Sequence, residues 1–175
     1  MTIKCKFSPL GKPKVDSYIP GTVIFENVPE AYKQTIVHKK ISEGVYELMC
    51  CSGGGGRYCY IGCNNGAAGA FFKGVVYFDS ERELEIKVGG CSYVSSPNGL
   101  STEITGCIYC QGGLSANAVC GGNTPPPRIE NGMVVLSTEI NAGGSCGGGT
   151  LFPGTKYGGN QQPGYFKLTY LRLEP

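Results

Sequence analysis

The chain has 175 residues, a net charge of +2 and 16% charged residues, a balance that indicates neither a nucleic-acid nor a membrane-surface partner. No apolar run approaches the roughly 18 residues of a membrane span, so membrane insertion is not expected. Of the 29 glycines, 26 lie between Gly53 and Gly164. Because 41% of the residues are hydrophobic, the chain can still form a core, and we expect its glycine-rich stretches to be ordered parts of the fold.

Short alternating or β-branched runs dominate the chain, and no window of about 11 or more residues keeps a helical period. In chain order, strands are predicted over Thr2–Phe7, Thr22–Phe25, Gln34–Lys40, Val45–Cys50, Val75–Phe78, Glu83–Val88, Met133–Leu136 and Tyr165–Leu171. Val45–Cys50 is nearly all apolar, as in a strand buried on both faces, whereas Glu83–Val88 alternates apolar and charged residues. The best helical candidate, Pro29–Gln34, is one turn long.

This pattern predicts an all-β, sandwich-like domain. Residues 1–43 are expected to supply N-terminal β strands that pack on, or lead into, a main glycine-rich β domain over residues 44–175. Between the strands lie the glycine-rich segments Ser52–Gly56, Gly62–Gly69, Gly89–Gly90, Gly112–Gly113, Gly121–Gly122, Gly143–Gly149 and Gly154–Gly164. These segments do not sustain a glycine at every third position, which excludes collagen for the whole chain.

Holding so many glycines in order is expensive. A glycine in regular structure costs about 0.5–1 kcal/mol relative to alanine, so 26 of them cost on the order of 13–26 kcal/mol. A typical domain is stable by only about 5–15 kcal/mol. Without a Cβ, however, backbones can approach closely, and extended segments of the polyglycine-II or polyproline-II kind can hydrogen-bond sideways. Disulfides and contacts in an oligomer are the other possible offsets.

The chain has ten cysteines, a number more typical of secreted proteins, but its sequence shows no recognisable signal peptide. We therefore expect synthesis in the cytoplasm and later release, with thiols that are free at first and can oxidise afterwards. Adjacent or closely spaced pairs are Cys50–Cys51, Cys59 with Cys63, and Cys107 with Cys110. Disulfides, buried thiols acting as small hydrophobes, and a zinc or iron–sulfur centre all stay open. Because the spacing between pairs fits no common zinc ribbon, we predict neither a metal site nor a cofactor.

Catalytic signals are missing from the sequence. The single histidine, His38, lies on a predicted strand beside Lys39 and Lys40, and no G-x-S-x-G or paired-carboxylate motif occurs. Nucleophilic catalysis would need a base beside a serine or cysteine. We therefore predict that the protein is not an enzyme.

Four segments, in this order, resemble the glycine-rich domains of bacteriophage tail-fibre and tail-tip adhesins and of related phage-like proteins. They are GVYELMCCSGGGG (Gly44–Gly56), GAAGAFFKGVVYF (Gly66–Phe78), LEIKVGG (Leu84–Gly90) and GTKYGGNQQPGYFKLTYL (Gly154–Leu171). The resemblance spans roughly residues 20–172. It implies polyglycine-II-like segments packed between strands. This chain differs from the family in its shorter, interrupted glycine runs and its many cysteines.

The resemblance implies a virion-associated adhesin or structural module, located on the virion or an extracellular appendage. Its partners would be a bacterial surface receptor or other virion proteins, and a homo-oligomer is expected. Tyrosine suits recognition surfaces because it joins a rigid apolar ring to a polar tip. The residues proposed to contact a receptor are Arg57, Tyr58, Tyr60, Tyr93, Tyr109 and Tyr157. Two alternatives remain: the tyrosines cap strands and shield glycine backbones, or the chain is a self-assembling subunit without a receptor.

Overall fold

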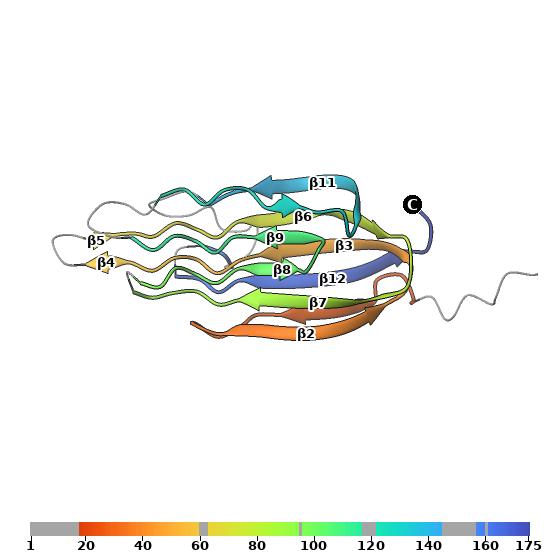
Figure 1. The fold of residues 1–175 in the computed structure, drawn as a ribbon, viewed down its shortest axis with the longest axis horizontal. Helices are drawn as coiled ribbons and strands as arrows, with labels where there is room; N and C mark the ends of the chain where they lie inside the picture. Colours follow the sequence, from red (N-terminus) through yellow and green to blue (C-terminus); the bar gives the residue numbers. More distant parts are fainter. Residues whose placement is uncertain (1–17, 60–62, 95, 117–121, 145–156, 160) are drawn as a thin grey trace, which may run out of the picture.

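The computed structural model describes residues 18–59, 63–94, 96–116, 122–144, 157–159 and 161–175. In these ranges the chain forms twelve β-strands and no helix. Two antiparallel five-stranded sheets pack face to face, so the prediction of an all-β sandwich is confirmed (Figure 1). A short hairpin pairs β4 (Tyr58–Cys59) with β5 (Cys63–Asn64) at one end of the molecule.

The first sheet has the strand order β1-β12-β3-β6-β11. Its strands are β1 (Val23–Asn27), β12 (Tyr165–Arg172), β3 (Gly44–Cys51), β6 (Phe71–Phe78) and β11 (Val134–Ala142). The long pairing registers join β3 to β12 on one side and to β6 on the other. The apolar run predicted to be buried on both faces is therefore the central strand of this sheet.

The second sheet has the strand order β10-β9-β8-β7-β2. Its strands are β10 (Arg128–Ile129), β9 (Ile108–Cys110), β8 (Thr102–Ile104), β7 (Arg82–Gly89) and β2 (Gln34–Ile41). The early strands β1 and β2 thus form one edge of each sheet. Residues 18–43 are built into the same sandwich as the rest of the described chain.

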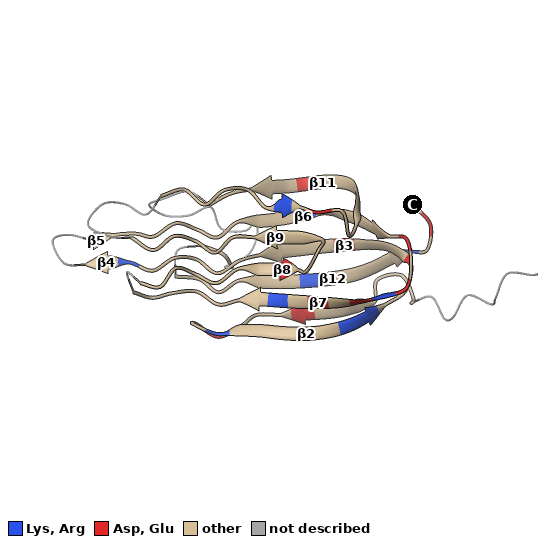
Figure 2. Cartoon of the chain, viewed as in Figure 1, with Lys and Arg blue, Asp and Glu red and all other residues tan. Residues whose placement is uncertain are grey.

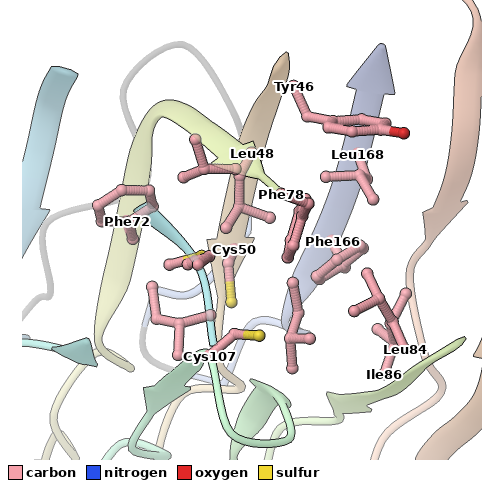
Figure 3. Close-up of a cluster of buried hydrophobic side chains, with 14 of the residues drawn as sticks. Tyr46, Leu48, Cys50, Phe72, Phe78, Leu84, Ile86, Cys107, Phe166 and Leu168 are labelled. Carbon is pink, nitrogen blue, oxygen red and sulfur yellow. The ribbon is translucent and has the colours of Figure 1, made fainter. Parts of the chain in front are cut away.

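The core lies between the two sheets and is filled from both sides (Figure 3). The alternation predicted for Glu83–Val88 is confirmed, since Leu84, Ile86 and Val88 are buried in this core. Tyr46 adds edge-on ring contacts at one end of the core, with centroid distances of 5.6 Å to Phe78 and 5.3 Å to Tyr170. A smaller cluster on the outer face of the first sheet joins Cys51, Phe71 and Tyr165.

The one-turn helix over Pro29–Gln34 is wrong: Tyr32 has a φ of 59°, which breaks a right-handed turn, and β2 already begins at Gln34. The expected strand Thr2–Phe7 lies outside the described residues. The short strands β4, β5, β8, β9 and β10 were not predicted.

The molecule is elongated and has two halves (Figure 1). In one half the strands form the sandwich. In the other half the chain segments continue side by side beyond the strands as far as the β4–β5 hairpin. Residue 18 and the C-terminus both lie at the sandwich end, opposite this hairpin.

Candidate functional site

The half beyond the strands is held together by backbone hydrogen bonds among six segments, which we call the glycine lattice. The lattice comprises residues 52–56, 66–70, 90–92, 98–100, 111–116 and 161–164. Within it, segment 52–56 donates to three different neighbours in turn. Ser52 N donates to Ala70 O (3.0 Å), Gly53 N to Leu100 O (3.1 Å) and Gly54 N to Gln162 O (2.9 Å), and Gly55 N returns to segment 66–70 at Ala67 O (2.9 Å).

The same three-residue spacing recurs in two other segments. Gly113 N and Ala116 N donate to Gly53 O (2.8 Å) and Gly56 O (3.0 Å). Ala67 N and Ala70 N donate to Leu114 O (2.7 Å) and Gln111 O (3.0 Å). A β-strand would direct its hydrogen bonds to two neighbours in one plane, whereas a chain with three residues per turn directs them to neighbours on all sides.

Glycine serves this lattice by lacking a side chain. Among the described glycines, a positive φ occurs at Gly21, Gly44, Gly106 and Gly158. None of these lies within a lattice segment, although Gly158 O accepts from Gly69 N at the lattice border (2.8 Å). A Cβ added to Gly53 would overlap the backbone at Gly90, and one added to Gly113 would overlap the backbone at Ala67. The backbones therefore pack directly against each other, at distances that no other residue type allows at these positions.

Ser52 marks the border between sandwich and lattice. It is completely buried, and its hydroxyl lies within hydrogen-bond distance of Ala70 O (3.1 Å) and Gln111 O (2.5 Å). One small side chain therefore ties together segments that continue β6 and β9 of the two sheets.

The lattice half carries almost no charge, in contrast to the sandwich (Figure 2). In the sequence, Arg57 is the one charged residue over positions 52–70, and positions 89–102 and 111–127 hold none. In the sandwich, charges pair with one another on the outer face of the second sheet, as Lys87 does with Glu103 (2.7 Å) and Glu85 (2.9 Å). The lattice thus presents a largely neutral surface of glycine, serine, asparagine and tyrosine.

Two of the predicted receptor-contact residues lie at the tip, where the lattice ends. Arg57 is exposed, and the next residue, Tyr58, is half-buried on β4. Tyr60 lies outside the described residues.

Tyr93 is exposed to 52% on a loop beside the lattice. Its ring meets the ring of Tyr32 edge-on, with centroids 5.8 Å apart. Tyr93 N donates to Tyr32 Oη (2.8 Å), and Gln161 Nε2 donates to Tyr93 O (2.8 Å). A hydrogen bond with the Cys91 thiol raises the pKa of Tyr93.

The sequence did not single out Tyr32. This residue precedes β2 in a loop that docks on the lattice side of the molecule, where Tyr32 N donates to Cys91 O (2.9 Å). Tyr32 is 45% exposed and Val94 is 51% exposed, so they extend the surface formed by Tyr93. Since 61 residues separate Tyr32 from Tyr93, local sequence carries no signal of this pairing.

Tyr109 and Tyr157 lie away from the tip. The Tyr109 ring lies under the Arg128 guanidinium, 4.9 Å from ring centroid to Cζ, and lines an open depression of about 300 Å³ with Gln111, Pro125 and Pro126. Tyr157 stacks on Tyr165 with ring centroids 4.7 Å apart and packs against the smaller hydrophobic cluster. Tyr157 therefore has a packing role, which is the alternative that the sequence left open for the tyrosines.

Neither a metal centre nor a membrane helix is found in the part of the chain that the structure describes. No group of three or more His, Cys, Asp or Glu side chains there is arranged to hold a metal ion. Over the same residues, no helix has the length and apolar character needed to cross a bilayer. No protein-family model, curated protein or solved structure matches the chain.

Proposed function

We propose that this protein is a virion-associated binding module of a phage tail fibre or tail tip, and that its glycine lattice half contacts a bacterial surface molecule. The observation that carries the proposal is the exposed surface of the lattice half, with Arg57 at the tip and the paired rings of Tyr93 and Tyr32 on loops beside the lattice. It combines exposed aromatic rings with a rigid, hydrogen-bonded support, and it carries little charge beyond Arg57 and the ion pair of Lys33 with Glu30 beside Tyr32. Such a surface binds without first ordering flexible loops, which lowers the entropic cost of association.

The arrangement of the two halves supports this role. Residue 18 and the C-terminus lie at the sandwich end (Figure 1). Attachment to a larger particle through either end of the described chain leaves the lattice pointing outward. The order of the four glycine-bearing segments supports a phage origin. The near absence of charge around the tip favours an uncharged partner, such as the hydroxyl-rich sugars of a bacterial polysaccharide.

Binding of fluorescently labelled protein to a panel of bacterial strains and their purified surface polysaccharides tests this function. Tyr93→Ala and Arg57→Ala are expected to weaken binding at least 10-fold, in the range of interface hot spots. Ile36→Ala is the matched control, because Ile36 is 54% exposed on β2 of the sandwich half. Equal loss in all three variants, or no binding to any strain or polysaccharide, would count against the proposal.

A second candidate function is a subunit that self-assembles without a receptor. It is favoured by three apolar side chains at neighbouring sheet edges: Ile129 on β10 is 41% exposed, and Val134 and Leu136 on β11 are 54% and 39% exposed. Light scattering separates the two candidates. A subunit of this kind forms oligomers of the pure chain at micromolar concentration, and these oligomers are indifferent to Tyr93→Ala.

A further inference from the structure

Cys50 and Cys110 face each other across the sandwich. Cys50 lies near the end of β3 in the first sheet, and Cys110 is the last residue of β9 in the second sheet. Both residues are completely buried, and their Sγ atoms are 3.2 Å apart. A disulfide bond is about 2.05 Å long, so the two sulfurs need to approach by only about 1 Å to be joined.

The two strands converge here because the sandwich ends here. Cys110 Sγ lies 3.7 Å from Cys50 O, so a side chain of one sheet contacts the backbone of the other. Two residues after Cys50, Ser52 Oγ reaches Gln111 O. The cysteines therefore occupy the last layer of side chains before the backbones pack directly in the lattice. A sulfur–sulfur bond at this place would clamp the two sheets and the base of the lattice together.

The neighbouring cysteines, Cys51 and Cys107, are not placed to form the same bond. Successive residues of a strand point to opposite faces, and Cys51 accordingly packs with Phe71 and Tyr165 on the outer face of the first sheet. Cys107 shares the main core with Cys50 (Figure 3). Cys51 faces away from the main core, and the sulfur that lies 3.2 Å from Cys50 Sγ is that of Cys110. The geometry therefore selects one thiol from each of the pairs Cys50–Cys51 and Cys107–Cys110.

We propose that Cys50 and Cys110 are a covalent modification site that forms an intramolecular disulfide between the two sheets under oxidising conditions. The oxidant is a small-molecule disulfide, for which oxidised glutathione is the probe. One protein thiolate attacks it, forms a mixed disulfide and releases one glutathione thiol. The second protein thiolate then displaces the other glutathione. The protein loses two protons and two electrons, and the glutathione disulfide is reduced to two thiols.

Burial controls when this exchange occurs. Desolvation in the core raises the pKa of the Cys110 thiol well above its usual range, so the reactive thiolate is scarce in the folded protein. The bond consequently forms while the chain folds or when the border region opens. Once formed, it is shielded from reductants by the same burial. This inference depends only on the redox environment, not on the proposed receptor binding.

The test begins with the full wild-type chain, refolded with oxidised and reduced glutathione or with a phosphine reductant. Remaining thiols are blocked after denaturation, and the unreduced protein is digested with chymotrypsin for mass spectrometry. Cleavage after Tyr109 separates Cys107 from Cys110, and Cys51→Ala resolves the ambiguity at Cys50–Cys51. The expected product joins Cys50 to Cys110. Recovery of both cysteines as blocked thiols, or a bond to Cys51 or Cys107, overturns the proposal.

A stability measurement gives a second, independent answer. The bond closes a span of 60 residues, so the oxidised protein is expected to melt on the order of 10 °C above the reduced protein. Cys110→Ala abolishes this difference, whereas Cys107→Ala, which removes another core thiol, preserves it. If Cys110→Ala does not fold, the wild-type peptide map decides. A bond without any gain in melting temperature contradicts the clamp.

Discussion

At the scale of single residues, glycine acts here mainly through the volume that it leaves free. The lattice glycines have no positive φ, and yet a Cβ at most of these positions would enter a neighbouring backbone. Composition alone indicated that ordered glycines need an offset. It did not indicate which glycines lie in contact, because that depends on segments far apart in the sequence.

Substitution of Gly53 by alanine tests this account. A Cβ there overlaps the backbone at Gly90, so we expect Gly53→Ala to destabilise the protein by about 3 kcal/mol or more, at the upper end for overpacking. Gly122→Ala is the matched control, because its Cβ would meet only the Leu114 side chain, at an ordinary 3.4 Å. Guanidinium unfolding midpoints measure both variants. Similar midpoints for the two would contradict direct backbone packing.

Tyr46 is expected to make the stability of the protein depend on pH. Burial raises its pKa to about 12, and its hydroxyl donates to Ser42 O (2.8 Å). Since the unfolded chain loses this proton near pH 10, the contribution of Tyr46 to stability is complete below pH 10 and is lost between pH 10 and 12. Unfolding midpoints across this range should therefore fall, and less steeply in Tyr46→Phe. Parallel curves for wild type and variant would show that Tyr46 is not responsible.

At the scale of elements, the strands that could be predicted closely from the sequence are the long ones with regular alternation. β3, β7 and β12 were predicted closely because each buries a regular set of side chains in the core. β8 and β9 have three residues each, too few for a period to appear, and their pairing depends on the chain reversal at Thr105–Cys107. β11 extends to Ala142, beyond its apolar start, because it pairs with β6 along its whole length.

The edge strand β11 allows the proposed self-association to be tested. Two register shifts interrupt its pairing with β6, and its one charged residue is Glu139. A lysine at an exposed edge discourages strand pairing between molecules. We expect Val134→Lys with Leu136→Lys to abolish any concentration-dependent association while leaving the melting temperature within a few degrees. Sedimentation of both forms at matched concentrations measures this, and persistent oligomers would exclude this edge as the interface.

At the scale of the whole molecule, most of the charge lies away from the lattice half, which is the half proposed to bind a receptor. Most of the ion pairs that the structure describes belong to the sandwich, one joins Lys33 to Glu30 in the β1–β2 loop, and Arg57 is the charged residue at the tip (Figure 2). The scarcity of charge in the glycine-rich segments can be read directly from the sequence, because charge is a local property. The contact between Tyr32 and Tyr93, by contrast, exists only after the β1–β2 loop has docked beside the lattice.

Because the tip carries little charge, we predict that the proposed binding depends only weakly on salt concentration. Binding through a tip whose charge is limited to Arg57 should change less than about 3-fold between 50 mM and 500 mM NaCl, because few charges are available to be screened. Titration of labelled protein against intact cells at the two salt concentrations measures this. A much steeper loss of affinity would show that Arg57 pairs with an anionic group on the receptor.

The three-residue repeat of the lattice also limits how its segments can slide. A shift of segment 52–56 by one residue would turn each donor by about 120°, away from its acceptor, and a shift by two would do the same. Only a slip of three residues, about 9 Å, restores the directions of the bonds. Ser52 then leaves Ala70 and Gln111, and Gly55 takes its place without a hydroxyl. The interruptions in the glycine runs therefore give the lattice one register, where an uninterrupted polyglycine stretch would have several of equal energy.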